Sequence, residues 1–279
     1  GTGWQIDSRE LLTPAQTGRL HARIEEFDQA YSRFRSDSLV TRLQADGGAC
    51  EFPPDLGPMI GVYEALLAAT DGVMTPLVGG SLERLGYDAG YSLQQSGPAV
   101  GSPDWSATIS VSGNTISVAE PVLIDFGAAG KGYLVDILAE ILVLDGVTGV
   151  VVDASGDLLN RSGSPLRVAL EHPYDPTRAI GVVELADGAI CGSASNRRAW
   201  GQGLHHVLDG LTGLPVDEVA ATWAVASDAL HADALSTALF FADAATLRAR
   251  TGWAFEAVRM MTDGRVEVTS DLPGEVFVR

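Results

Sequence analysis

One lysine stands apart from the other basic residues of this chain. Lys131 is the only lysine among 279 residues, and every other basic side chain is an arginine. It lies in VLIDFGAAGKGYLVDILAEIL, residues 122–142, where a strand-like run leads through GAAGKG into a helical pattern. Small residues let a ligand approach the backbone, and the free N–H groups at a helix start attract anions. The loop therefore predicts an anion site, although a tight strand-to-helix turn with a solvated lysine explains it equally well.

The same loop does not fit a nucleoside-triphosphate motif. A Walker A loop requires GxxxxGK followed by Ser or Thr. Here Asp125 stands in place of the first glycine, and Gly132 follows Lys131. The Walker A interpretation is therefore excluded.

A second group of candidate residues lies in SDALHADALSTALFFA, residues 227–242. Asp233 and Thr237 are four positions apart, so they share one face of a helix, with Ser236 beside them. A carboxylate and hydroxyl groups form a set of hard oxygen ligands suited to Mg²⁺. The alternative is a surface carboxylate and a threonine that bonds its own helix, and the isolated segment favours that alternative. His231 is interpreted as a surface or packing residue.

The third group lies in GLHHVLDGLTGLPV, residues 203–216, where two histidines precede a strand-like VLD and a GLTG turn. His206 could act as a general base, the usual role of histidine near neutral pH. An edge-strand histidine that hydrogen-bonds the following turn explains the pattern as well. Two further segments, VVDASGDLLNRSG and ICGSASNRRAW, place Gly and Ser directly after strands. They could line a cleft, but hairpin turns are the default interpretation of both.

The elements that must position these residues are helical first and strand-like later. Apolar residues recur at helical spacing over residues 12–43, where SDS predicts a turn and a new N-cap before a short helix. A second helix is predicted from about residue 59 to residue 70. The alternating pattern of ATISVSGNTISVAE predicts a β-hairpin. Further strands are predicted within residues 147–155, 166–172, 181–186, 222–227 and 265–270.

This pattern predicts an α+β fold in which a helical N-terminal third accompanies a mostly antiparallel sheet with interspersed helices. No Pro- or Ser-rich linker argues for a hinge, so residues 1–279 are expected to form one domain. Residues 122–142 and 222–241 share a strand-turn-helix pattern, which leaves an internal duplication open.

Composition limits the classes of partner. With 36 acidic and 18 basic side chains the formal net charge is -18, which makes nucleic acids and anionic membrane surfaces poor partners. The longest apolar runs are too short for a membrane span, and the opening GTGWQIDSRE lacks the pattern of a secretion signal. Either a cytoplasmic protein or a cell-envelope protein with its export signal removed is expected. Cys50 and Cys191 allow at most one disulfide and form no metal-binding pattern.

Five segments of the chain, taken in order, resemble motifs of the ApbE-type FAD:protein FMN transferases. They are SRFRSDSLVTRL, GVMTPLVGGSLERLGY, LIDFGAAGKGY, HHVLDGLTGLP and ADALSTAL. The resemblance implies an ApbE-like (T-fold-like) arrangement of antiparallel sheets with packed helices. It also implies that FAD binds in a cleft and that Mg²⁺ binds on its pyrophosphate.

Position by position, the resemblance implies three sets of site residues. The metal ligands would be the backbone carbonyl of Ala128 and the side chains of Asp233 and Thr237, with Ser236 as an occasional additional ligand. His206 or Asp209 would be the local base. The residues expected to contact FAD are Phe34, Leu85, Gly86, Tyr87, Asp125, Lys131 and Leu208.

The implied reaction is protein flavinylation, the transfer of FMN to a protein. Mg²⁺ would polarise the phosphorus next to riboflavin, a Thr or Ser hydroxyl of an acceptor flavoprotein would attack, and AMP would leave. A Mg²⁺-dependent FAD pyrophosphatase, with water as the nucleophile, is the alternative that the sequence leaves open. A non-catalytic flavin-binding protein would need no metal ligands, and the pairing of Asp233 with Thr237 argues against it.

The chain departs from the family pattern at several positions. Leu85 stands where the family has Trp, which removes an aromatic contact expected for FAD. Thr75 replaces an Asp, and Gly210 replaces a Pro. Ala194 adds a methyl group after Ser193 where the family has Gly, which is expected to affect docking of the target peptide. The family's Gly-Gly-Asp becomes Ser-Gly-Asp at residues 155–157.

Overall fold

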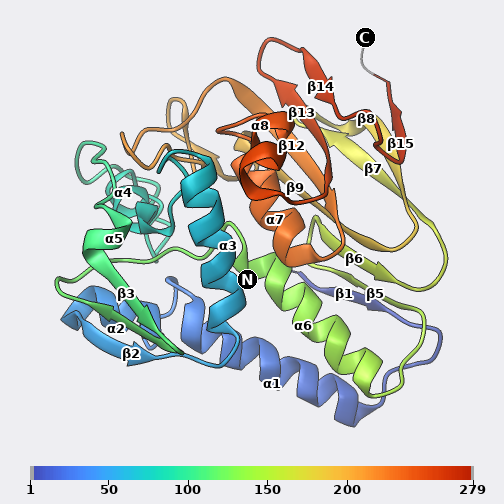
Figure 1. Ribbon diagram of the computed structural model, residues 1–279, viewed down its shortest axis with the longest axis horizontal. Coiled ribbons are helices and arrows are strands. Elements are labelled where there is room, and N and C mark those ends of the chain that lie inside the picture. The colour runs from blue at the N-terminus through green and yellow to red at the C-terminus, as the bar shows by residue number, and fades with distance from the viewer. Residues whose placement is uncertain (1–2, 278–279) are drawn as a thin grey trace. The chain divides into compact units, whose positions relative to one another are not determined.

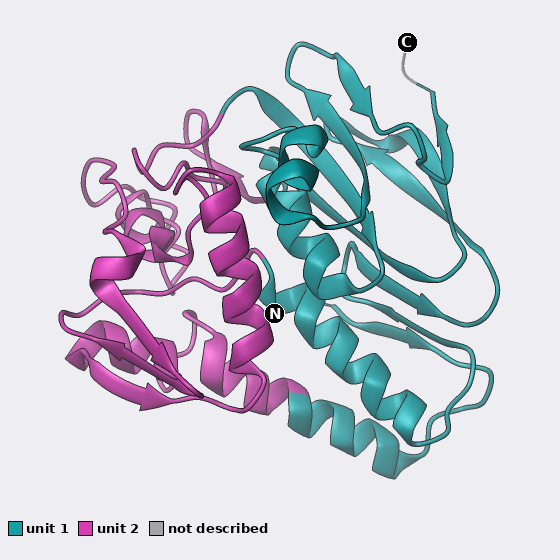
Figure 2. Ribbon diagram, viewed as in Figure 1, with its two compact units in different colours: residues 1–23, 129–197, 217–279 teal, residues 24–128, 198–216 magenta. Residues whose placement is uncertain are grey.

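The computed structural model describes residues 3–277, so the first and last two residues of the chain lie outside the described part. The chain forms two compact units (Figure 2). Unit 1 comprises residues 1–23, 129–197 and 217–279, and unit 2 comprises residues 24–128 and 198–216. The expectation of a single domain over residues 1–279 stays a prediction. Within residues 3–277, no helix has both the length and the apolar character that a membrane crossing requires.

Unit 1 is built on a seven-stranded antiparallel sheet (Figure 1), and it also holds a three-stranded antiparallel sheet and three complete helices. The order of the larger sheet is β1 (Gln5–Asp7), β5 (Val150–Asp153), β6 (Asp157–Arg161), β9 (Gly188–Ala194), β12 (Val219–Ala226), β13 (Glu256–Met261) and β14 (Val266–Val268). The order of the smaller sheet is β15 (Gly274–Val276), β8 (Asp175–Leu185) and β7 (Leu166–His172). The helices are α6 (Gly130–Leu144), α7 (Ala229–Ala238) and α8 (Ala244–Thr251).

Two interfaces hold unit 1 together. Leu170, Val183, Ile190 and Val258 belong to a buried apolar cluster that joins the smaller sheet to strands of the larger one. Helices α6 and α7 pack against each other and against the larger sheet. Their contact requires Gly132, because a Cβ there would come within 2.5 Å of the Cβ of Asp233 and would also overlap the carbonyl of Ala229. This close packing brings the start of α6 to the side of α7.

Unit 2 contains a small antiparallel sheet and several helices. Helix α1 (Pro14–Tyr31) begins in unit 1 and continues into unit 2. The sheet has the order β2 (Gly48–Glu51), β4 (Thr115–Val118) and β3 (Ile109–Ser112), and a separate two-stranded sheet pairs β10 (Ala199–Trp200) with β11 (Leu204–His205). The helices are α2 (Leu39–Asp46), α3 (Leu56–Ala69), α4 (Gly79–Arg84) and α5 (Trp105–Thr108), and Pro76–Val78 forms a 3₁₀ turn.

The main features of the α+β prediction are confirmed. The helical stretch over residues 12–43 divides into α1 and α2, and the Ser38 side chain accepts a hydrogen bond from the N–H of Thr41, as expected of an N-cap. Strands β3 and β4 form the predicted hairpin, with Ser112 opposite Thr115. Strands β1, β2, β6, β9, β10, β11, β13 and β15 were not predicted, since they are short or have little apolar-polar alternation and pairing with other strands fixes their place. Two expectations were wrong: the strand-like run before GAAGKG forms no strand, and ICGSASNRRAW forms the end of β9, a 3₁₀ turn and β10 rather than a hairpin turn.

Candidate active site

The first part of the candidate site lies in unit 1, at the start of α6. Lys131 forms an ion pair with Asp157 on β6, and its Nζ donates a hydrogen bond to the carbonyl of Ala154 at 3.2 Å. The side chain of Asp157 is only 1% exposed, whereas that of Lys131 is 26% exposed. Lys131 is therefore bound within unit 1 rather than solvated in a free turn.

The charges around this pair explain its protonation. Burial lowers the pKa of Lys131, but the carboxylates of Asp157 and Asp233 outweigh burial and leave that pKa raised. Burial raises the pKa of Asp157, and the ammonium of Lys131 counteracts part of this rise. Lys131 therefore carries its positive charge at neutral pH.

Asp233 lies on α7 and is fixed by the start of α6. Its Oδ2 accepts a hydrogen bond of 2.8 Å from the N–H of Gly132, the residue that follows Lys131. Thr237 is one turn further along α7, as the spacing predicted, and is half-buried. Ser236 is fully buried and donates to the carbonyl of Asp233 at 2.8 Å. It also shares a 2.8 Å hydrogen bond with Ser193 of β9, so its role as a metal ligand stays a prediction.

The donor set of Asp233 and Thr237 fits a hard cation. Within residues 3–277, no group of three or more His, Cys, Asp or Glu residues is placed to hold a metal ion. The predicted set differs from such a cluster, because it has one carboxylate, one hydroxyl and the carbonyl of Ala128, which belongs to unit 2. Oxygen ligands without thiol or imidazole suit Mg²⁺ rather than Zn²⁺.

A second carboxylate, which the sequence analysis missed, holds α7 in place. Asp136 of α6 accepts 2.8 Å hydrogen bonds from the N–H groups of Ala229 and Leu230, so it binds the start of α7. Burial raises the pKa of Asp136 to about 6. Asp228, the N-cap residue, accepts a further hydrogen bond from the N–H of His231. The helix that carries Asp233 is thus anchored at its first turn by two acidic side chains.

Unit 2 contains a buried arginine that the sequence analysis also missed. Arg33 is 4% exposed and donates from Nε to Asp125 Oδ2 at 2.6 Å and from Nη1 to the carbonyl of Tyr87 at 2.8 Å. The other oxygen of Asp125 accepts a 2.6 Å hydrogen bond from the N–H of Gly127. Asp125 is therefore oriented from both sides. The sequence offered one indication of this role, because Arg33 directly precedes Phe34, a predicted FAD contact, in SRFRSDSL.

Aromatic rings surround this arginine. The guanidinium of Arg33 lies 4.2 Å from the ring centre of Phe34 and 4.7 Å from that of Tyr87. Phe34 stacks on Tyr91 at 5.0 Å, and Tyr87 stacks on Trp200 at 5.6 Å. Burial raises the pKa of Tyr87 to about 12, so its hydroxyl stays neutral at physiological pH. Two of the residues predicted to contact FAD, Phe34 and Tyr87, thus share one aromatic cluster.

Trp200 supplies an aromatic ring next to Leu85. The side chain of Leu85 is buried, and its carbonyl accepts a 2.8 Å hydrogen bond from Trp200 Nε1. Gly86, with φ of +104°, leaves no space for a side chain, since a Cβ would lie 2.5 Å from the backbone nitrogen of Gln94. Leu208 is buried in the same apolar cluster as Leu85. Trp200 thus brings an aromatic ring into the apolar cluster that contains Leu85, the position at which the family pattern has Trp.

The two candidate bases lie close together in the chain but differ in their surroundings. Asp209 Oδ1 accepts hydrogen bonds from the N–H groups of Leu211 at 2.8 Å and Thr212 at 2.9 Å, so it shapes the turn. His206 is half-buried, and its Nδ1 is buried with no hydrogen-bond partner in the described part of the chain. Burial, followed by the nearby charge of Arg198, lowers the pKa of His206 to about 3. His206 is therefore neutral at pH 7, and its buried Nδ1 has unused hydrogen-bonding capacity.

We expect Arg33→Lys to lower the free energy of unfolding by about 2 kcal/mol. An ammonium cannot reach Asp125 and the Tyr87 carbonyl at once, so one hydrogen bond is lost. A hydrogen bond to a charged group contributes about 1.5–3 kcal/mol. Urea denaturation measures the change. Arg35→Lys is the matched control, since Arg35 pairs with Asp37 and Glu25 on the surface and should lose less than about 1 kcal/mol. Equal losses in the two variants would contradict a special role for Arg33.

The chain is similar in sequence and in fold to known proteins. The sequence model of the ApbE family matches residues 1–254. An FAD:protein FMN transferase of Vibrio cholerae is 28% identical over 255 residues, which cover 84% of this chain and 73% of that protein. The FAD:protein FMN transferase of Escherichia coli K12 is 25% identical over 265 residues, covering 86% and 75% of the two chains. The crystal structure of the ApbE protein of Thermotoga maritima has the same fold, with a TM-score of 0.82 and 22% identity over 97% of this chain and 94% of that one. The chain therefore belongs to the ApbE family.

Proposed function

We propose that this enzyme, an FAD:protein FMN transferase of the ApbE family, uses Mg²⁺ to move FMN from FAD onto a Thr or Ser hydroxyl of an acceptor flavoprotein, with release of AMP. One observation supports the proposal most: the carboxylate of Asp233 is held by the first turn of α6, next to the charged Lys131. The proposed metal-ligating carboxylate would then lie beside a cation and a helix start, and both of these suit a pyrophosphate.

Each residue has a distinct part in this proposal. Asp233, Thr237 and the carbonyl of Ala128 would hold Mg²⁺, which when bound would neutralise the pyrophosphate and polarise the phosphorus next to riboflavin. Lys131 would bind a phosphate oxygen. Phe34 and Tyr87 would lie along the flavin nucleotide, and Arg33 would keep both rings in position through its stacking contacts.

His206 is the stronger of the two base candidates. The carboxylate of Asp209 already accepts two backbone hydrogen bonds, whereas Nδ1 of His206 is free of partners among the described residues. The imidazole of His206 would take the proton of the acceptor hydroxyl as the hydroxyl oxygen bonds to the phosphorus and AMP leaves, which requires the side chain to turn toward the acceptor. A pKa of about 3 makes His206 a weak base in the free protein. The negative charge of bound FAD nearby would raise this pKa and strengthen the base.

The test is a reaction of the purified protein with FAD, Mg²⁺ and an acceptor flavin-carrier domain. We expect AMP to appear in equal amount with an FMN adduct that survives denaturation and is seen by mass spectrometry on the acceptor. Replacing the acceptor Thr or Ser by Ala should remove the adduct. Rapid hydrolysis of free FAD without an adduct on any acceptor would instead identify a pyrophosphatase.

The low pKa of His206 predicts a pH dependence of stability. Between pH 6.5 and about 3 the unfolded chain binds a proton at this position that the folded chain does not bind, so stability falls as the pH falls. We expect His206→Gln to remove up to about 1.4 kcal/mol per pH unit of this loss. Urea denaturation between pH 7 and pH 4.5 measures the difference, with the exposed His21→Gln as the control. Parallel stability profiles for wild type and His206→Gln would show that His206 titrates normally.

A further inference from the structure

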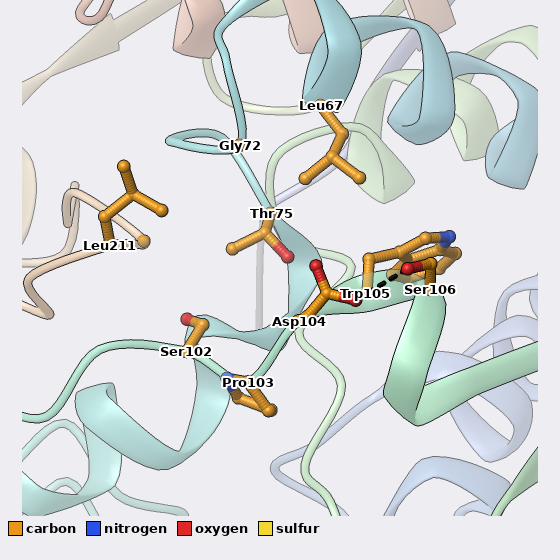
Figure 3. Close-up of a pocket in the computed structure, with 10 residues that line it drawn as sticks. Leu67, Gly72, Thr75, Ser102, Pro103, Asp104, Trp105, Ser106 and Leu211 are labelled. Carbon is orange, nitrogen blue, oxygen red and sulfur yellow. Dashed lines mark hydrogen bonds between the residues drawn. The ribbon is translucent and has the colours of Figure 1, made fainter.

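Unit 2 contains a pocket of about 300 Å³ that the assigned site residues do not use (Figure 3). Its lining comes from the end of α3, the loop after it, the segment that leads into α5 and the turn after Asp209. The lining residues are Leu67, Gly72, Thr75, Ser102, Pro103, Asp104, Trp105, Ser106, Gly210 and Leu211. A volume of this size is at the lower end of the range for small-ligand pockets and is ample for one large side chain.

The lining combines apolar surface with a negative charge. Asp104 Oδ1 accepts hydrogen bonds from the N–H of Ala107 at 2.8 Å and from the hydroxyl of Ser106 at 2.6 Å, the latter drawn in Figure 3. The hydroxyl of Ser106 is the main cause of a lowered pKa of Asp104, which keeps this carboxylate ionised. Neither bond uses Asp104 Oδ2. Trp105 adds an aromatic ring, and no lining residue is basic.

A buried hydroxyl also lies at this pocket. The Oγ of Ser102 is shielded from solvent and has no hydrogen-bond partner among residues 3–277. A hydroxyl in this state gains a hydrogen bond when a ligand with an N–H donor enters. Apolar stems with cationic N–H heads match the lining as a whole, because the stem contacts Leu67 and Trp105 while the head meets Asp104 and Ser102. Among protein side chains, arginine and lysine have this chemistry.

The pocket is continuous with the turn that carries Asp209. The N–H of Ser102 donates to the carbonyl of Gly210 at 2.7 Å, and the N–H of Gly210 donates to the carbonyl of Val73 at 2.8 Å. Gly210 fits tightly, since a Cβ there would lie 2.5 Å from Cγ2 of Thr75. One wall of the pocket, at Gly210, therefore lies only a few positions along the chain from the candidate base His206.

Exposed apolar side chains border the same turn. Val100, Leu211 and Leu214 are 46%, 62% and 53% exposed. The two segments that carry them are in close contact, because a Cβ on Gly213 would overlap the carbonyl of Val100, and one on Gly101 would overlap the carbonyl of Leu211. Large apolar side chains exposed together on one surface are typical of a protein-binding site.

We propose that this pocket and its apolar border form the docking surface for the acceptor protein, and that the pocket binds an arginine or lysine side chain of the acceptor near its modified Thr or Ser. This inference rests on the proposed transferase function. The net charge of -18 favours an acceptor that is basic near the site of contact. The bound basic side chain fixes the acceptor segment, and this brings the hydroxyl within reach of the candidate base.

Two variants test the surface and the charge separately. Leu67→Trp fills the pocket, and Asp104→Asn removes its charge while still capping α5. We expect each to raise the KM for the acceptor domain at least about tenfold, with the slow hydrolysis of FAD in the absence of acceptor unchanged. Leu144→Trp, at an exposed position near the end of α6 in unit 1, is the matched control and should change neither rate.

The acceptor is varied as well. Each Arg or Lys near the modified hydroxyl of the acceptor domain is changed to Met. One of these acceptor variants should have a higher KM than the unchanged acceptor with the wild-type enzyme, but the same KM as the unchanged acceptor with the Asp104→Asn enzyme. An unchanged acceptor KM in Leu67→Trp would overturn the docking surface while leaving the transferase function intact. A loss in Leu67→Trp but not in Asp104→Asn would overturn the assignment to a basic side chain. FAD hydrolysis with no FMN adduct on any acceptor, even with wild-type enzyme, would overturn the proposed function and this inference together.

Discussion

Asp233→Asn is expected to reduce Mg²⁺-dependent release of AMP from FAD by at least about 100-fold. The substitution removes the only carboxylate of the proposed metal set, and a neutral amide is a much weaker ligand for a dication. The amide oxygen can still accept the hydrogen bond from the N–H of Gly132. The contact between α6 and α7 should therefore persist, and the melting temperature should change by only a few degrees.

Direct binding separates the metal role from a general loss of activity. Calorimetric titration of Mg²⁺ into the protein with FAD should give strong binding for wild type and none for Asp233→Asn. Thr237→Val should weaken Mg²⁺ binding less, since a neutral hydroxyl contributes less than a carboxylate. Ser236→Ala removes the hydrogen bond to Ser193 and should lower stability. A weaker affinity for Mg²⁺ in this variant would identify Ser236 as an additional ligand, and an unchanged affinity would give it a structural role alone. Normal Mg²⁺ binding and AMP release in Asp233→Asn would refute the metal assignment.

The features that the sequence predicted correctly depend on short stretches of chain. The alternating pattern of residues 107–120 was enough to predict a hairpin, and the SDS turn was enough to predict the N-cap at Ser38. The spacing of Asp233 and Thr237 fixed their common face on α7. In each case the interacting residues are at most about a dozen positions apart, so local periodicity and turn chemistry determine the outcome.

The missed residues have partners far away in the chain. Arg33 binds Asp125, Asp136 binds the start of α7, and Trp200 binds the carbonyl of Leu85. Asp157 was interpreted as part of a hairpin turn and of the family's Gly-Gly-Asp segment, and its ion pair with Lys131 depends on the pairing of β5 and β6. No local pattern identifies such pairs, because tertiary packing alone brings their members together.

That ion pair gives Lys131 a structural role besides its proposed contact with FAD, and the two roles can be separated. Lys131→Met leaves the carboxylate of Asp157 buried without its counter-charge. Removing one partner of a buried ion pair costs about 3–5 kcal/mol, so we expect a loss of that size in urea denaturation. The double variant Lys131→Met/Asp157→Asn contains neither charge and should recover most of the stability of the wild type.

FAD affinity of the double variant then decides which role matters for function. If Lys131 served only to neutralise Asp157, the double variant would bind FAD as tightly as the wild type. We expect the opposite result, with FAD binding at least about tenfold weaker in both variants, because an ammonium at the first turn of α6 binds a phosphate oxygen together with the backbone N–H groups there. Titration of FAD at fixed Mg²⁺, followed by flavin fluorescence, measures the affinity. Asp157→Asn alone keeps Lys131 charged and releases it from its partner, so this third variant should bind FAD at least as well as the wild type does. Weak binding by Asp157→Asn would show that FAD requires the ion pair rather than the lysine alone.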